Sequence, residues 1–217
     1  DEQVILREGD QWRIATQRVG AVRVPGTLTG LLQARLDALP GSERDLLQRA
    51  SVVGRLFWDS AVACLSDVGQ DKVSSSLRDI RARELIYLRE RSAFSGSDEY
   101  IFKHALLRDV AYEMVLLQQR REYHRRVAAW LEENATGRLG EYLGLIAEHY
   151  ALAGDADRAA DFWERAGDHA LLVGAGNGAL TAFQRVMELA HWDEGGLAQA
   201  RLQFKLARAS IRLGDYR

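Results

Sequence analysis

Cysteine is almost absent from this sequence of 217 residues. Cys64 is the only one, so the chain forms no internal disulfide and offers no cysteine cluster to a metal ion. No apolar run approaches the roughly 18 residues that suggest a membrane span, and no leader of basic and then apolar residues opens the sequence. These absences favour a reducing compartment. We therefore expect a cytoplasmic protein with no membrane partner.

Proline is equally scarce, because it occurs only at positions 25 and 40. No proline occurs after Pro40, so no proline would interrupt a succession of helices from Gly41 onward. Hydrophobic residues make up 47% and charged residues 28% of the chain, which is typical of a globular protein with a core. Lysine and arginine together number 29 against 31 aspartates and glutamates. This balance disfavours a nucleic-acid partner for the chain as a whole.

The first 26 residues have an extended pattern. Residues 4–6 and 12–14 are short apolar runs, and the Glu-Gly-Asp segment at 8–10 between them has the chemistry of a turn. We predict a small β-hairpin there. The sequence begins without an initiator methionine, and its helical pattern is still running at Arg217. Both features are those of a piece of a longer chain.

From residue 27 the apolar side chains recur at helical spacing. The pattern then shifts towards a period of two in two short runs on either side of a polar loop, which predicts a two-stranded hairpin. A winged-helix domain has this order of elements, short helices followed by a hairpin. Such a domain either binds DNA or packs inside a larger protein. The predicted helices are 27–39, 42–54, 58–65 and 71–85, and the predicted strands are 86–88 and 100–102.

The chain after His104 has a helical pattern throughout. One helix or a kinked pair is expected over 105–133, followed by a linker at 134–140. Small residues such as Ala147, Ala182 and Ala207 recur where neighbouring helices must come close. Stacked helical hairpins produce this pattern, so we predict an array like that of tetratricopeptide (TPR) repeats. Gly-Asp or Gly-Asn turns are expected at 154–155, 176–177 and 214–215.

The sequence offers no catalytic constellation. No lysine follows a glycine, so a phosphate-binding P-loop is missing. The five histidines are at least 20 residues apart and form no local metal motif. The glycine-rich segment at 174–178 follows no predicted strand and is interpreted as a turn between helices, while Cys64 lies on an apolar helix face and is interpreted as buried filler. We expect no catalytic residue, no metal site and no enzyme activity from this chain by itself.

Three arginines are candidates for a nucleic-acid contact. Arg78, Arg81 and Arg83 lie on the helix that a DNA-reading winged helix places in the major groove. Acidic residues interrupt this stretch. The predicted wing also carries Asp98 and Glu99, where a DNA-binding wing is basic.

Two long stretches carry a resemblance to a known family. Residues 24–57 contain Val-Pro-Gly-Thr-Leu, then Leu-Leu-Gln-Ala-Arg-Leu-Asp-Ala-Leu-Pro and Leu-Leu-Gln-Arg-Ala-Ser-Val-Val-Gly-Arg-Leu-Phe. Residues 102–112 read Phe-Lys-His-Ala-Leu-Leu-Arg-Asp-Val-Ala-Tyr, and 120–128 read Arg-Arg-Glu-Tyr-His-Arg-Arg-Val-Ala. Both resemble the region after the ATPase core in bacterial signalling ATPases of the STAND class, which are AAA-type. The two segments are most similar to those of members fused to class III adenylate or guanylate cyclases. Large LuxR-type regulators carry similar segments.

The resemblance covers nearly the whole chain and implies a mostly α fold with three parts. Residues 1–26 resemble the end of the ATPase lid, 27–134 a winged-helix domain with its following helices, and 135–217 a truncated TPR-like array. It implies a non-catalytic regulatory and interaction segment. In that family the winged helix holds the nucleotide-bound ATPase core of the same protein, and the repeats bind a protein or peptide. ADP or ATP is then a cofactor of the parent protein and not of this segment.

The resemblance also assigns a role to one histidine. In that family a histidine at the start of the helix after the wing contacts the ADP β-phosphate, and His104 occupies the matching position. The family motif continues with an aspartate, where this chain has Ala105, so the role of that aspartate does not carry over. The structural alternative is that His104 only caps the helix or is half-buried.

Two other functions stay open from the sequence. One is a DNA-binding winged-helix transcriptional regulator with a TPR-like sensor region, in which Arg78, Arg81 and Arg83 contact DNA. The other is a scaffold whose repeats bind a peptide and whose winged helix is only a cap.

Overall fold

The computed structural model describes residues 5–8, 11–14, 26–189 and 196–212. The chain divides into two compact units, residues 1–39 and 40–217. In the first unit, strand β1 (Ile5–Glu8) pairs antiparallel with β2 (Gln11–Ile14), and helix α2 (Gly26–Asp37) follows along the chain. The pairing confirms the predicted hairpin strands, whose turn lies outside the described residues.

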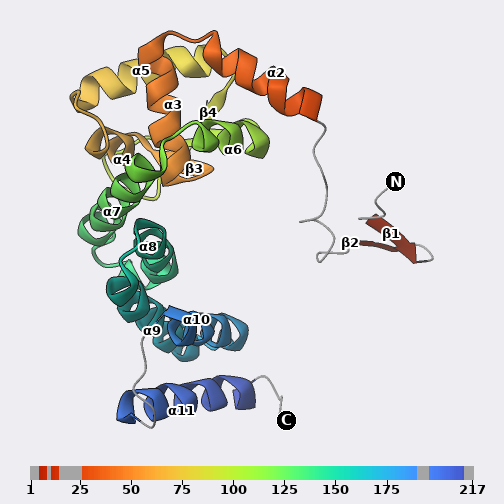
Figure 1. The fold of residues 1–217 in the computed structure, drawn as a ribbon, viewed down its shortest axis with the longest axis vertical. Coiled ribbons are helices and arrows are strands. Elements are labelled where there is room, and N and C mark those ends of the chain that lie inside the picture. The colour runs from red at the N-terminus through yellow and green to blue at the C-terminus, as the bar shows by residue number, and fades with distance from the viewer. Residues whose placement is uncertain (1–4, 9–10, 15–25, 190–195, 213–217) are drawn as a thin grey trace. The chain divides into compact units, whose positions relative to one another are not determined.

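The second unit begins with a sheet region, residues 40–113, where helices surround a three-stranded antiparallel sheet (Figure 1). The strand order is β3–β5–β4, with Phe57 opposite Tyr100 and Tyr87 opposite Ile101. The elements are α3 (Gly41–Val53), β3 (Leu56–Trp58), α4 (Asp59–Cys64), α5 (Gln70–Ala82), β4 (Ile86–Leu88), β5 (Glu99–Phe102) and α6 (Ala105–Glu113).

The sheet therefore has one strand, β3, more than the predicted two-stranded hairpin. Strand β3 has only three residues, too few to show a period of two, and it pairs with residues more than 40 positions later. The sequence pattern instead predicts a helix that begins at Trp58. The burial of Phe57, stacked on Tyr100 with ring centroids 5.7 Å apart, explains why this short strand forms.

The remaining residues form a helical array, 117–212, in which each described helix packs against the next (Figure 1). The break at 114–116 between α6 and the first array helix confirms the kinked pair expected over 105–133. The fold is thus mostly helical with one small three-stranded sheet and the β1–β2 pair. The array helices are α7 (Leu117–Asn134), α8 (Leu139–Ala153), α9 (Ala156–Leu172), α10 (Gly176–Leu189) and α11 (Leu197–Arg212).

Two glycines end array helices in the left-handed conformation. Gly154 has φ 83° and is followed by Asp155, whose carboxylate accepts from the Arg158 backbone N–H and caps α9. The prediction of a turn at 176–177 is wrong, because those residues lie in the first turn of α10. The turn is centred on Gly174, φ 79°, where a side chain would be strained. The turn predicted at 214–215 lies outside the described residues.

Close helix approach in the array depends on glycine more than on alanine. A Cβ on Gly167 would lie 2.3 Å from the ring of Phe183, which is fully buried. Ala147 and Ala182 are buried as expected, whereas Ala207 is exposed, so that part of the prediction is wrong. The α9–α10 contact therefore requires a residue without a side chain at one point.

A buried lysine joins the last described helix to α9. Lys205 is 8% exposed, and its Nζ donates to Glu164 and Asp168, each at 2.6 Å. The two carboxylates are four residues apart on one face of α9. None of the described helices is both long and apolar enough to cross a membrane. The domain borders at 26/27 and 134/135 stay predictions.

Candidate functional site

His104 lies where strand β5 ends and helix α6 begins. It occupies the N-cap position, and its backbone carbonyl accepts from the N–H groups of Leu107 and Arg108 at 3.1 and 3.4 Å. The side chain makes no capping hydrogen bond and is exposed. Among the described residues its ring has no hydrogen-bond partner. The backbone alone caps the helix, so the imidazole is available to a group outside the chain.

The surroundings of His104 are basic, but the neighbouring cations already have partners. Lys103 Nζ donates to Glu84 at 2.8 Å, and this hydrogen bond raises the pKa of Lys103. Arg108 Nε donates to the Ser51 carbonyl at 2.8 Å, and its guanidinium lies over the ring of Tyr112. The first turn of α6 has no acidic side chain, and a helix N-terminus carries a partial positive charge. The arrangement is suited to an anion contacted chiefly by His104.

The three candidate arginines do not form one surface group. Arg78 and Arg81 are exposed on α5, three residues apart. Arg83 lies beyond the helix at its C-cap, and its Nε is 2.8 Å from Glu43 Oε2. The sequence pattern extended the helix to 85 and therefore placed Arg83 on it. Two of the three predicted residues are exposed on α5.

The loop between β4 and β5 is fastened to the body of the protein. The ring of Phe94 lies 4.7 Å from Trp58, 4.9 Å from Trp130 and 5.1 Å from Tyr142, measured between ring centroids. These aromatic residues come from β3, α7 and α8, so the loop joins the sheet region to the array.

Glu99 is an acceptor in the interior, and the prediction that it forms part of an acidic wing is wrong. It is 3% exposed and accepts from Trp58 Nε1 at 2.9 Å, from the Ala93 backbone N–H at 3.0 Å and from Arg89 at 2.8 Å. Asp98 is exposed, but its backbone N–H donates to Asp59. Glu99 is the first residue of β5 and pairs with Trp58 across the sheet, whereas Asp98 precedes the strand.

A hydrogen-bonded chain of buried side chains crosses the boundary between the sheet region and the array. Tyr112 Oη lies 2.9 Å from His124 Nε2, and His124 Nδ1 lies 2.8 Å from His149 Nδ1. One Nδ1 atom donates to the other, which requires that at least one of the two rings has an unprotonated Nδ1. Each hydrogen bond in the chain is satisfied when both rings are neutral.

Burial keeps these two histidines neutral. They are 1% and 4% exposed. Desolvation lowers the pKa of His124 to about 4, helped by Arg108 and Arg120, and lowers the pKa of His149 to about 3. Sequence reasoning missed the pair, because the two histidines are 25 residues apart and share no motif spacing.

Cys64 is partly buried and unsuited to nucleophilic chemistry. Desolvation raises the pKa of its thiol to about 11, so almost no thiolate exists at neutral pH. The backbone carbonyl of Cys64 accepts a hydrogen bond from Arg126. Among the described residues, no group of three or more histidine, cysteine or acidic side chains is placed to hold a metal ion.

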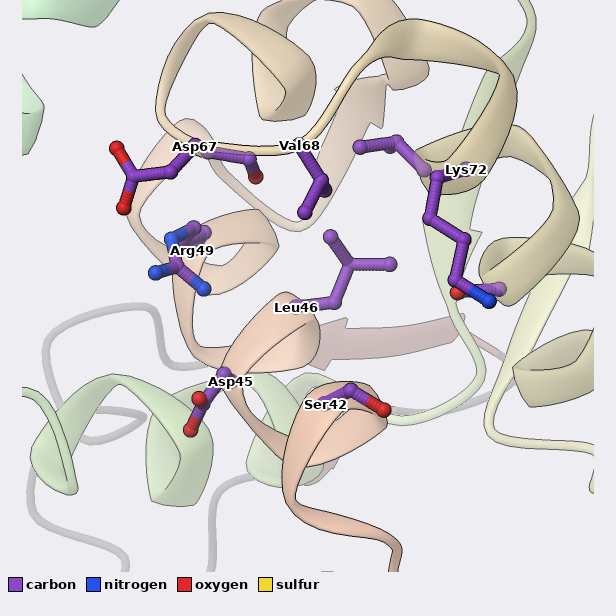
Figure 2. A pocket seen from close by; sticks show the side chains of 10 residues that line it. Ser42, Asp45, Leu46, Arg49, Asp67, Val68 and Lys72 are labelled. Atoms are coloured by element: carbon purple, nitrogen blue, oxygen red, sulfur yellow. The ribbon is translucent and has the colours of Figure 1, made fainter.

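A cavity of about 200 Å³ opens between α3, the turn after α4 and α5 (Figure 2). Leu46 and Val68 occupy the middle of the view, with Lys72 on one side and Asp67 and Arg49 on the other. Two cations and two carboxylates line it, so their charges balance and give no preference for a nucleotide phosphate. The other lining residues are Ser42, Asp45, Ser66, Val73 and Ser76.

Comparison with known proteins supplies little further information. No family model matches the chain. An alignment 129 residues long, which covers 54% of this chain, shows 27% identity to an uncharacterized protein of Rhizobium meliloti (strain 1021). That alignment covers only 12% of the relative, so the chain spans a small part of the protein it matches. Because that protein is uncharacterized, the match indicates no activity for this chain.

Proposed function

We propose that this chain is a non-catalytic regulatory and protein-interaction segment of a larger, cytoplasmic STAND-type signalling ATPase, of the group associated with cyclase domains. In this proposal residues 27–134 form a winged-helix domain that holds the nucleotide-bound core, and residues 135–217 form a TPR-like array that binds a partner. ADP or ATP belongs to the core and not to this segment.

Two architectural features support the proposal. The sheet region follows the order α3–β3–α4–α5–β4–β5, a short helical bundle closed by an antiparallel sheet, as a winged-helix domain requires. Helices α7 to α11 then pack in succession, each against the next, as TPR-like hairpins do. The hydrogen-bonded chain from Tyr112 through His124 to His149 joins the first two array helices, α7 and α8, to the sheet region.

The observation that carries the proposal is the free imidazole of His104. It stands exposed at the start of α6 with no partner among the described residues, while its basic neighbours Lys103 and Arg108 are engaged. An imidazole donates a hydrogen bond to a phosphate oxygen, and a helix N-terminus favours an anion beside it. This contact disappears when the domain moves away from the core, which makes it a sensor of bound ADP.

The test is ADP retention by the complete protein. His104→Ala should speed ADP release by roughly ten- to a hundredfold, the loss of one hydrogen bond to a charged group of about 1.5–3 kcal/mol. His104→Gln retains a neutral donor and should recover part of the retention, and the exposed Arg121→Ala serves as the matched control. ADP retention unchanged by His104→Ala would contradict the latch.

DNA binding is the second candidate function, favoured by one observation. Arg78 and Arg81 are exposed on the helix that a DNA-reading winged helix uses. Against it, Arg83 and Arg89 contact carboxylates and the wing loop is packed against aromatic rings. Duplex binding at low salt that weakens in Arg78→Ala and Arg81→Ala would support this function, whereas no binding at low salt would dismiss it.

A further inference from the structure

The cavity between α3, the turn after α4 and α5 combines an apolar middle with charged sides (Figure 2). Leu46 and Val73 line it and belong to the core, at 4% and 0% exposed, whereas Val68 also lines it and is 50% exposed. Every lining residue lies between positions 42 and 76. The cavity is therefore part of the sheet region and not an end face of the helical array.

The charged side chains are divided between two sides of the cavity. Figure 2 shows Lys72, from α5, on one side of the apolar middle. Asp45, Asp67 and Arg49 lie on the opposite side. Two carboxylates and one guanidinium leave that side with a net negative charge, while Lys72 makes the first side positive.

Three of these charged groups have no partner within the described chain. The side chains of Asp45, Asp67 and Lys72 are exposed and form no hydrogen bond or ion pair with another described residue. Arg49 is held in place, because its Nε donates to the Leu65 carbonyl at 3.0 Å. A ligand can therefore pair with the two carboxylates and with Lys72 without displacing an existing contact.

Charges of opposite sign on opposite sides select a ligand by its own charges. Lys72 repels a ligand that is only cationic, and Asp45 and Asp67 repel one that is only anionic. A molecule with one charge of each sign at its two ends pairs with both sides, and an apolar segment between the ends covers Val68. The volume sets the length, because an engineered cavity of about 150 Å³ holds the six carbons of benzene and this cavity has about 200 Å³.

We propose that this cavity binds a linear zwitterion, in which an apolar segment of about six carbons separates an ammonium group from a carboxylate. The ammonium group pairs with Asp45 and Asp67, and the carboxylate pairs with Lys72. The hydroxyl groups of Ser42 and Ser76 also line the cavity and offer further hydrogen bonds to the ligand. The proposal adds a binding site to the regulatory segment proposed above and does not depend on a bound nucleotide.

The test compares three probes of similar length, 6-aminohexanoate, hexanoate and hexylammonium. Each is titrated into the 217-residue chain, and amide chemical shifts in NMR spectra report where and how tightly it binds. 6-Aminohexanoate should bind at least roughly fivefold more tightly than either of the others, because it keeps the ion pair that each of them lacks. Its largest changes in chemical shift should fall within residues 42–76.

Substitutions assign each end of the ligand to its side of the cavity. Lys72→Met removes the partner of the carboxylate, so 6-aminohexanoate should then bind no better than hexylammonium. Asp45→Asn with Asp67→Asn removes the partners of the ammonium group, so it should then bind no better than hexanoate. Asp79→Asn changes an exposed aspartate of α5 that does not line the cavity and should leave all three affinities unchanged. All of the substituted side chains are exposed, and far-UV circular dichroism checks that each variant is folded.

Three results would overturn the proposal. They are equal affinity for the three probes, no binding of 6-aminohexanoate, and binding whose chemical-shift changes fall outside the cavity. These results are independent of ADP retention in the complete protein. The zwitterion proposal and the latch proposal can therefore fail separately.

Discussion

The sheet region and the helical array hold their shapes in different ways. In the sheet region, two buried carboxylates gather groups that are distant in sequence. Asp59 accepts from Ser74, Ser97 and the Asp98 backbone, and Glu99 accepts from Trp58, Ala93 and Arg89. In the array each helix mainly contacts its neighbours along the chain, with Lys205 as a longer link. Substitution of a buried carboxylate should therefore destabilise the whole sheet region. A substitution in the array should destabilise only the neighbouring helices.

The largest expected effect comes from removing Glu99. Glu99→Ala leaves the buried Trp58 Nε1–H and the Ala93 N–H without acceptors, so the free energy of unfolding should fall by about 3 kcal/mol or more. Urea denaturation measures this. Glu90→Ala, on the same loop but exposed, should change stability by less than about 0.5 kcal/mol. Equal effects from the two variants would show that Glu99 is not a structural acceptor.

The next largest effect is acid destabilisation at the His124–His149 pair. Both pKa values are lowered in the folded state, so the neutral rings contribute stability in full above the usual pKa of 6.5. That contribution is lost as the pH falls towards about 4 and about 3. For His124 alone the shift corresponds to about 3 kcal/mol, at 1.36 kcal/mol per pKa unit. Unfolding free energies measured between pH 7 and pH 4 give the slope.

A matched variant isolates the histidine contribution from that of the carboxylates. The doubly substituted His124→Gln, His149→Gln chain keeps polar side chains at both positions but cannot titrate there. It should be less stable at pH 7 and should lose less stability than the natural chain between pH 6.5 and pH 4. Parallel pH profiles for the two proteins would mean that the pair does not titrate in this range.

A moderate effect of either sign is expected from two glycines of the array. Gly167→Ala places a methyl group against the buried Phe183 ring and should cost about 1–3 kcal/mol. Gly178 lies in the first turn of α10, and a methyl group there would meet only ordinary contacts at 3.7 Å or more, with Ala170 and Ala175. Gly178→Ala should therefore stabilise the chain by about 0.5–1 kcal/mol. Thermal unfolding should move in opposite directions for the two variants. Stabilisation by Gly167→Ala would show that the helices can separate there at no cost.

The smallest effect is expected at Lys205. Lys205→Met retains the apolar stem and removes the charge, and Glu164 and Asp168 remain partly exposed to water. The global loss should be about 1 kcal/mol or less. Hydrogen exchange should increase in α11 and leave the sheet region unchanged. Faster exchange in β3 to β5 would contradict the local character of the array.

Local patterns in the sequence predicted most helices and strands β4 and β5, because both depend on short-range periodicity. Strand β3 could not be predicted, because three residues are too few to show a period of two and their pairing partner is distant in the sequence. Glu99 and the His124–His149 pair escaped for the same reason: each depends on contacts across 25 or more residues or on a loop that folds back. The exposure of His104 follows from its place before an amphipathic helix, but its freedom from partners required the structure.

The central claim is that this chain is the regulatory segment of a larger ATPase, and the native gene product tests it directly. Its intact mass should be well above the 24.3 kDa of this chain, and the purified protein should contain ADP bound by a P-loop domain that precedes residue 1. A native protein of 24.3 kDa without nucleotide would contradict the account and leave partner binding on the array as the function to pursue.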